Sequence, residues 1–431
     1  MMKKIIILIF TTLSLSSLYA QKTSSKDVLA TALSDEELQY NQQLATFAQG
    51  LKFHIPIVKQ VEARIGFNGS ALGDTLYGYI RNEDTYGIQI GLNSFKEIKQ
   101  QKVLKISQIG VYQSENRVLE QRALMARYQS LVAVRFTQEA LITRQKLDTL
   151  LSKKHEILRG MMERGLDIKV KDVMDTEGDQ NTLQLNLFGL ENDKRFHQSQ
   201  LQQFLENKTL SELDFDDFIT IEKIAEIVGN QKLIPSQFPS IDYKIARTQL
   251  ATAELDYVNS QNRQIFNTAR IGYDNPLYLE EQKPKKFNTL NNFSLRFGFT
   301  VPLVGNNNFK RSEALLKQRI AQNDVDLLRQ QNKLNVDIQY LKLENLLKQH
   351  RYFKEKIENN LIKKMLNNGK LLAQMTPLEL VDMQVTQQKL EVRYLDIVQE
   401  MTSEYIKLLE LTGALSAKPL KNYLSNTLEK F

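Results

Sequence analysis

Two short stretches of the chain alternate apolar and polar residues and are nearly identical. Residues 63–68 read ARIGFN, and residues 269–274 read ARIGYD. Successive side chains of a β-strand point to opposite faces, so this alternation predicts strands with one apolar face and one polar face. A second alternating stretch follows each copy, YGIQIGL at 86–92 and FSLRFGF at 293–299. The pattern predicts two hairpins, with strands at about 60–69, 84–94, 264–274 and 291–302.

The polar face of these predicted strands carries arginine and glycine. Arg64, Arg270 and Arg296 all fall on it. Aromatic residues lie near the strand ends, at Tyr77, Tyr79, Tyr278 and Phe287. Alternation with aromatic margins is typical of membrane β-barrels, in which the arginines would line the lumen. Two alternatives stay open: a half-buried sheet in a soluble domain, and pairing of the arginines with residues such as Asp274.

Long helical patterns separate the hairpins. No proline occurs between Ile57 and Ile234, and residues 96–163 are rich in the helix formers Leu, Lys, Gln, Glu and Arg. In the second half, apolar residues recur every seven positions at Ile320, Leu327, Leu334 and Leu341. A seven-residue repeat predicts a left-handed coiled coil. We therefore expect long helices at 96–163 and 308–366, the first about 100 Å long.

Each long helix is expected to turn back at a glycine. Gly165 would end the first, with a returning helix to about Phe204. Gly369 would end the second, with a returning helix that begins at Pro377, is capped by Thr376 and stops at Gly413. Shorter helices are predicted at 34–52 and 239–262, each leading into an ARIG strand.

The matching segments keep a nearly constant spacing, which indicates an internal duplication. The spacing between the matching segments is too long for a solenoid repeat. We predict a first repeat at 21–206, a junction segment at 207–237, a second repeat at 238–413 and a C-terminal tail at 414–431.

Residues 1–20 have the features of a secretory signal peptide. Two lysines precede an apolar run, and Ala20 is a small residue at the expected cleavage point. A membrane anchor is the alternative, but the run is shorter than the ~18 residues that a spanning helix needs. No later segment is apolar for that length, so we expect an exported chain whose membrane-spanning part, if any, is β-sheet.

Composition narrows the possible classes of function. The chain contains no cysteine, which excludes disulfides and thiolate chemistry. Without Lys3 and Lys4 of the signal, 55 basic and 50 acidic residues leave a net charge of +5, which is too mild to predict nucleic-acid binding. The four histidines, His54, His155, His197 and His350, lack metal-ligand spacing. We expect no catalysis, no cofactor and no bound metal.

These features together resemble the TolC-like outer-membrane efflux protein family. The resemblance covers roughly residues 34–413 and depends on organisation, on the tip segments 165–175 and 369–384, and on the strand LRFGFTVPL at 295–303. It implies a mainly α-helical chain with a small β part. It further implies a homotrimer in which each chain gives four strands to one membrane β-barrel, continued by an α-helical barrel in the periplasm. Two features depart from the family's pattern: His54-Ile55-Pro56 interrupts the first helix, and the first half has no proline that matches Pro302.

The resemblance also assigns roles to the helical tips. Glu379 and Asp382 match acidic positions that ring the periplasmic entrance of the tunnel, with Asp172 and Asp175 as their first-half equivalents. A solvated helix face, or acids that complement a helix dipole, is the alternative. The two tips are expected to dock a periplasmic adaptor protein, with a plain solvated turn as the alternative. These tip residues are Arg164, Gly165, Leu166, Asn368, Gly369 and Lys370.

The sequence thus predicts a passive exit duct in the cell outer membrane, part of a tripartite efflux or type I secretion system. Its expected partners are two further copies of the chain, an adaptor, an inner-membrane transporter and outer-membrane lipid. A periplasmic or surface coiled-coil protein with a structural or adhesive role is the alternative.

Overall fold

The computed structural model describes residues 23–51, 57–71, 80–205, 213–215, 217–229, 238–262, 266–277, 293–299 and 308–431. The predicted signal at 1–20, the break at 54–56, the four loop aromatics, the Asp274 side chain and Pro302 lie outside the described residues. The described chain is mainly helical with a small strand part, as predicted. None of its helices is both long enough and apolar enough to cross a membrane.

The chain divides into two units, and each takes segments from both predicted halves. Unit 1 comprises Met1–Asn41, Glu115–Ser240 and Leu328–Phe431, and unit 2 comprises Gln42–Ser114 and Ile241–Leu327. Two long helices, α4 (Phe95–Glu163) and α8 (Asn308–Glu358), contribute to both units.

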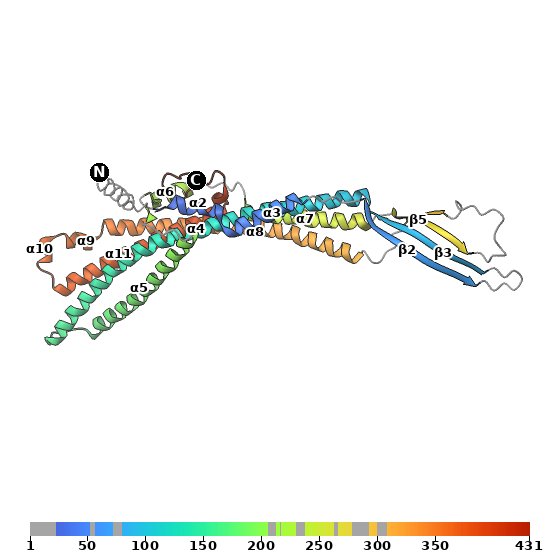
Figure 1. Ribbon diagram of the computed structural model, residues 1–431. Helices are drawn as coiled ribbons and strands as arrows, with labels where there is room; N and C mark the ends of the chain where they lie inside the picture. Colours follow the sequence, from blue (N-terminus) through green and yellow to red (C-terminus); the bar gives the residue numbers. More distant parts are fainter. Residues whose placement is uncertain are drawn as a thin grey trace, which may run out of the picture. The chain divides into compact units, whose positions relative to one another are not determined.

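Unit 2 contains the sheet that the alternating patterns predict. Strands β2 (Val58–Ala71), β3 (Ile80–Leu92), β5 (Phe266–Leu277) and β6 (Phe293–Phe299) lie side by side in the order β2-β3-β5-β6 (Figure 1). All three neighbouring pairs are antiparallel. The two hairpins therefore join into one sheet through β3 and β5.

The helices of unit 2 flank this sheet in sequence. Helix α3 (Glu36–Gly50), most of which belongs to unit 2, precedes β2. Helix α7 (Pro239–Asn262) precedes β5. Polar side chains tie α7 to its neighbours: Gln101 of α4 bonds the Tyr257 hydroxyl at 3.1 Å, and Lys244 pairs with Asp324 of α8 at 2.8 Å.

The first helical hairpin of unit 1 turns at Gly165, as predicted. The Gly165 amide bonds the Met162 carbonyl and the Leu166 amide bonds the Met161 carbonyl, both at 3.0 Å. This pair of bonds is a Schellman motif, which requires a left-handed residue, and Gly165 has φ +66°. The returning helix α5 runs from Val170 to Phe204.

The second hairpin differs from the prediction of one helix that turns at Gly369. Helix α8 ends at Glu358, and two short helices follow, α9 (Leu361–Leu366) and α10 (Gly369–Leu372). Asparagine side chains cause these breaks: Asn360 accepts from the Ile362 amide at 2.9 Å, and Asn368 from the Lys370 amide at 3.2 Å. Gly369 is thus the first residue of a helix. The return helix α11 (Pro377–Leu411) has Thr376 as its N-cap, as predicted.

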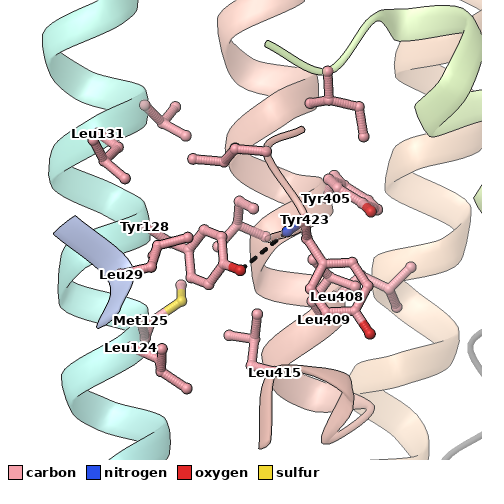
Figure 2. Packing of buried hydrophobic residues seen from close by; sticks show 14 of the residues in the cluster. Leu29, Leu124, Met125, Tyr128, Leu131, Tyr405, Leu408, Leu409, Leu415 and Tyr423 are labelled. Carbon is pink, nitrogen blue, oxygen red and sulfur yellow. Dashed lines mark hydrogen bonds between the residues drawn. The ribbon is translucent and has the colours of Figure 1, made fainter. Parts of the chain in front are cut away.

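Both ends of the chain complete the core of unit 1. Buried residues of α2 (Ser25–Ala30), α4, α6 (Ile221–Gly229) and α11 form one cluster with Leu415, Leu420 and Leu424 of the last segment. The Tyr128 hydroxyl donates to the Lys421 carbonyl at 2.8 Å. It also accepts from the Tyr423 amide at 3.1 Å, the bond drawn in Figure 2. The segments predicted as a junction and a tail therefore both supply buried residues.

Candidate functional site

Three successive rows on one face of the sheet in unit 2 are apolar and open to the surroundings. The strand register aligns its residues in three rows across the four strands. These rows are Ile65-Tyr86-Tyr273-Phe293, Ala63-Ile88-Ile271-Leu295 and Val61-Ile90-Ala269-Phe297. Ile65 is 66% exposed, Ile88 53% and Leu295 62%. We call these twelve residues the apolar sheet face; an open apolar patch of this kind on a chain marks an interaction surface.

The opposite face, the polar sheet face, carries the three predicted arginines. Arg270 of β5 lies directly opposite Arg296 of β6, with Gln89 and Glu62 continuing the same row. Arg64 lies one row away and pairs with Glu62 at 2.9 Å. Like charges placed opposite each other across two strands are unfavourable. The structure therefore places two arginines side by side on β5 and β6, and it pairs Arg64 with a residue that strand alternation could have identified.

Glycines on the polar sheet face leave space for the polar side chains beside them. A Cβ at Gly87 would lie 3.0 Å from Nε of Arg270, and one at Gly272 would lie 2.9 Å from Oγ of Ser294. A Cβ at Gly66 would lie 2.7 Å from Oγ1 of Thr85. The glycines thus allow Arg270 to lie across the neighbouring strand β3.

The two predicted carboxylates of the second tip have different kinds of partner. Glu379 closes a capping box: its carboxylate accepts from the Thr376 amide and hydroxyl, both at 2.9 Å. These bonds lower the pKa of the Glu379 carboxyl. Asp382 instead pairs with Lys154 of α4 at 2.7 Å. Glu379 therefore stabilises the start of its own helix, and Asp382 joins the two hairpins.

Two lysines that the sequence analysis did not identify bind the tip region together. Lys154 reaches Asp382, and Lys389 of α11 reaches Asp179 of α5 at 2.5 Å. Leu151, Leu183, Val381 and other apolar side chains of the same three helices, α4, α5 and α11, pack in a separate cluster. No local sequence signal reveals either pair, because each joins helices that are far apart along the chain.

The remaining predicted tip residues are accessible. Asp172 is half-buried in the first turn of α5, where the helix dipole favours an acid, and Asp175 is exposed. The structure places neither of them beside Glu379 or Asp382 by any contact among the described residues. All six residues expected to dock an adaptor are exposed: Arg164, Gly165, Leu166, Asn368, Gly369 and Lys370.

The described histidines lie apart from one another and have different partners. His155 lies 3.6 Å from Glu177, His197 lies 3.1 Å from Gln200, and His350 lies 3.0 Å from the Tyr394 hydroxyl. His54 lies outside the described residues. Within the described ranges, no three His, Asp or Glu side chains are grouped so as to hold a metal ion.

Neither a protein-family model nor a curated protein matches the chain in sequence. Solved structures match it in fold. One is a crystal structure of CusC, described in connection with folding and transmembrane channel formation. It has a TM-score of 0.60 at 13% identity, and the match covers 92% of this chain and 95% of the CusC chain. The open-state MtrE outer membrane channel of Neisseria gonorrhoeae has a TM-score of 0.60 at 13% identity, covering 90% and 88%. The outer membrane protein VceC of Vibrio cholerae has a TM-score of 0.58 at 12% identity, covering 90% and 96%.

This chain has the fold of the TolC-like outer-membrane channels. The likeness extends over nearly the whole chain and nearly the whole of each channel, so the TolC-like fold is not confined to one unit. At 12 to 13% identity it establishes the fold alone. It confirms the mainly α-helical fold with a small β part that the sequence resemblance implies.

Proposed function

We propose that this protein is the passive outer-membrane exit duct of an efflux or type I secretion system. The observation that carries the proposal is the apolar sheet face, with Ile65, Ile88 and Leu295 more than half exposed on a sheet attached to long helices. Exposing such a surface to water costs about 25 cal/mol for each Å². Lipid acyl chains remove that cost, so the sheet is suited to a membrane.

A single chain does not supply a complete wall for a pore. Its sheet has four strands, and β2 and β6 are the edges. The smallest membrane barrels need about eight strands, and open sheet edges do not occur in lipid. We infer that β2 of one copy pairs with β6 of the next, and that three copies close a barrel of twelve strands. In this arrangement the two halves of the chain, 21–206 and 238–413, are duplicated repeats that each give one hairpin.

The helices offer a second surface for the same assembly. The residues of the seven-residue repeat on α8 are more than half exposed: Ile320 is 52% exposed, Leu327 54%, Leu334 59% and Leu341 66%. A repeat of this kind favours helix against helix in a coiled coil. We take these residues to contact neighbouring copies, so that the helices form a tunnel in the periplasm below the barrel.

The polar features then line the passage and its entrance. The polar sheet face would surround the lumen and give it positive charge through Arg270 and Arg296. Glu379, Asp382, Asp172 and Asp175 would lie at the periplasmic entrance, where Lys154 holds Asp382 at 2.7 Å. The exposed tips would contact a periplasmic adaptor, through which an inner-membrane transporter supplies substrate.

Single-channel recording in planar bilayers tests the proposal. Purified, folded protein should insert and give discrete conductance steps, and a variant with Ile65→Glu and Leu295→Glu should fail to insert because it places carboxylates on the apolar sheet face. A matched control, Gln89→Glu on the polar sheet face, should still form pores. Repeated absence of conductance from folded oligomer, together with an oligomer that stays monodisperse without detergent, would instead support a periplasmic or surface coiled-coil protein.

A further inference from the structure

We propose that the first turns of α4 and α8 form a binding surface for anionic phospholipid headgroups at the periplasmic edge of the membrane. The surface, named here the basic border, consists of Phe95, Lys96 and Lys99 of α4 and Phe309, Lys310 and Arg311 of α8. All six belong to unit 2, which also holds the sheet. The inference rests on the proposed function, because it takes the apolar sheet face to lie in lipid.

The position of the basic border follows from the chain itself. Helix α4 begins at Phe95, only three residues after β3 ends at Leu92. Three residues span at most about 11 Å, so Phe95 lies within that distance of the end of the sheet. If the sheet lies in the membrane, the start of α4 therefore lies at its surface.

Each helix start exposes an aromatic ring. Phe95 is 82% exposed and Phe309 is 77% exposed, although both are large apolar side chains. Water is a poor environment for such rings, whereas membrane proteins gather aromatic residues at the boundary between lipid and water. The two rings occupy the same place in the two halves, each one residue before a lysine.

Lys310 and Arg311 lie at a helix start, where acidic side chains are favoured. Helix N-termini favour acidic side chains because of the helix dipole, and α5, α6, α7 and α11 each have one in the first turn. The first turn of α8 has no acid and instead presents Lys310 and Arg311. Positive side chains here gain most from an external anion, which offsets both their own charge and the positive end of the dipole.

The charge near both helix starts is strongly one-sided at the surface. Residues 95–106 contain four lysines, at 96, 99, 102 and 105, and one acid, Glu97, which is 1% exposed. On α8, Glu313 is the first acid after Lys310 and Arg311 in the sequence. It pairs with Lys317 at 2.8 Å, so that pair includes neither Lys310 nor Arg311. The exposed charge therefore complements a negatively charged membrane surface.

A phospholipid fits this arrangement better than a soluble anion. Its acyl chains would cover the apolar sheet face. Its phosphate would lie against the lysines at the start of the helices that follow the strands. The apolar surface, the aromatic rings and the cations follow one another in the order of hydrocarbon, interface and headgroup. A soluble anion would use the cations alone and would leave Phe95 and Phe309 exposed.

Lipid binding to the purified oligomer tests the inference. Protein in a neutral detergent is titrated with phosphatidylglycerol or with phosphatidylcholine of the same acyl chains, and bound lipid is counted by native mass spectrometry. The protein should prefer phosphatidylglycerol, and the preference should fall with added salt. A variant with Lys96→Gln, Lys99→Gln, Lys310→Gln and Arg311→Gln should bind it at least about tenfold more weakly.

Controls make each outcome decisive. A variant with Lys146→Gln, Arg195→Gln, Lys333→Gln and Arg351→Gln removes four exposed cations of unit 1 and should keep the preference. Replacing Lys96, Lys99 and Lys310 by arginine should also keep it. The inference is overturned if both quadruple variants lose the lipid preference equally. It is also overturned if inorganic phosphate displaces the lipid more than chloride does at equal ionic strength. Pores with no lipid preference overturn it while leaving the duct intact, and folded protein that forms no pores overturns the duct itself.

Discussion

Two buried tyrosines of unit 1 should respond in opposite ways to the same substitution. The Tyr128 hydroxyl has two backbone partners, the Lys421 carbonyl at 2.8 Å and the Tyr423 amide at 3.1 Å. Tyr128→Phe leaves both partners in a buried site, and each orphaned group costs about 1–3 kcal/mol. We therefore expect this substitution to lower the free energy of unfolding by about 2–4 kcal/mol.

Tyr405 lies in the same core, but its hydroxyl has no hydrogen-bond partner among the described residues, although the side chain is 0% exposed (Figure 2). Tyr405→Phe removes this unsatisfied group and keeps the ring. A buried hydroxyl without a partner costs about 1–3 kcal/mol, so the substitution should be neutral or should stabilise the protein by up to that amount. Burial raises the pKa of both tyrosine hydroxyls above the ordinary value, so both remain protonated in neutral solution.

Urea unfolding followed by circular dichroism measures the difference in one buffer and detergent. We expect the transition midpoint to fall for Tyr128→Phe and to stay or rise for Tyr405→Phe, with similar slopes. The two variants remove the same atom from the same type of residue, so neither hydrophobicity nor volume explains opposite shifts. Equal destabilisation by both variants would refute the hydrogen-bond reasoning, and a Tyr405→Phe variant less stable than Tyr128→Phe would reverse it.

Three further changes test other parts of the structure. Gly165→Ala should cost about 1–2 kcal/mol in thermal unfolding because alanine resists φ +66°, whereas Gly160→Ala within α4 should not destabilise. Burial alone would raise the pKa of the Glu404 carboxyl, but bonds from Lys342, Lys407 and Gln339 outweigh it and lower the pKa to about 2. Glu404 should thus contribute roughly 3 kcal/mol above pH ~4.5 that is lost as the pH falls towards 2, a dependence absent from Glu404→Gln. Replacing Arg270 and Arg296 by glutamate should shift the reversal potential of the pore towards cation selectivity, and an unchanged potential would contradict a lumen lined by these arginines.

The strands and the first tip could be predicted because their signals are local. Alternation in ARIGFN and ARIGYD fixes which side chains share a face, and the register then places Ala63, Ile88 and Ile271 in one row. Gly165 follows a long helical pattern and supplies the left-handed residue that its turn requires. In these segments, neighbouring residues determine the conformation without help from distant parts of the chain.

The second tip and its ion pairs could not be predicted in the same way. Asn360 and Asn368 break the helix before Gly369, but asparagine is only a weak signal inside a helical pattern. The pair of Lys154 and Asp382 depends on how α4 and α11 are aligned, which no short segment of sequence encodes. The burial of Leu420 and Leu424 likewise depends on the distant α4 and α11.

The core of unit 1 has a consequence for the timing of folding. It combines Val28 and Leu29 with Leu420, Tyr423 and Leu424, which are synthesised only after both helical hairpins. Until these later residues leave the ribosome, Tyr128 has neither of its backbone partners and the cluster has an open side. The core of unit 1 therefore cannot be completed before residues 420–424 have emerged, and a chain cut before Leu420 would have an incomplete core.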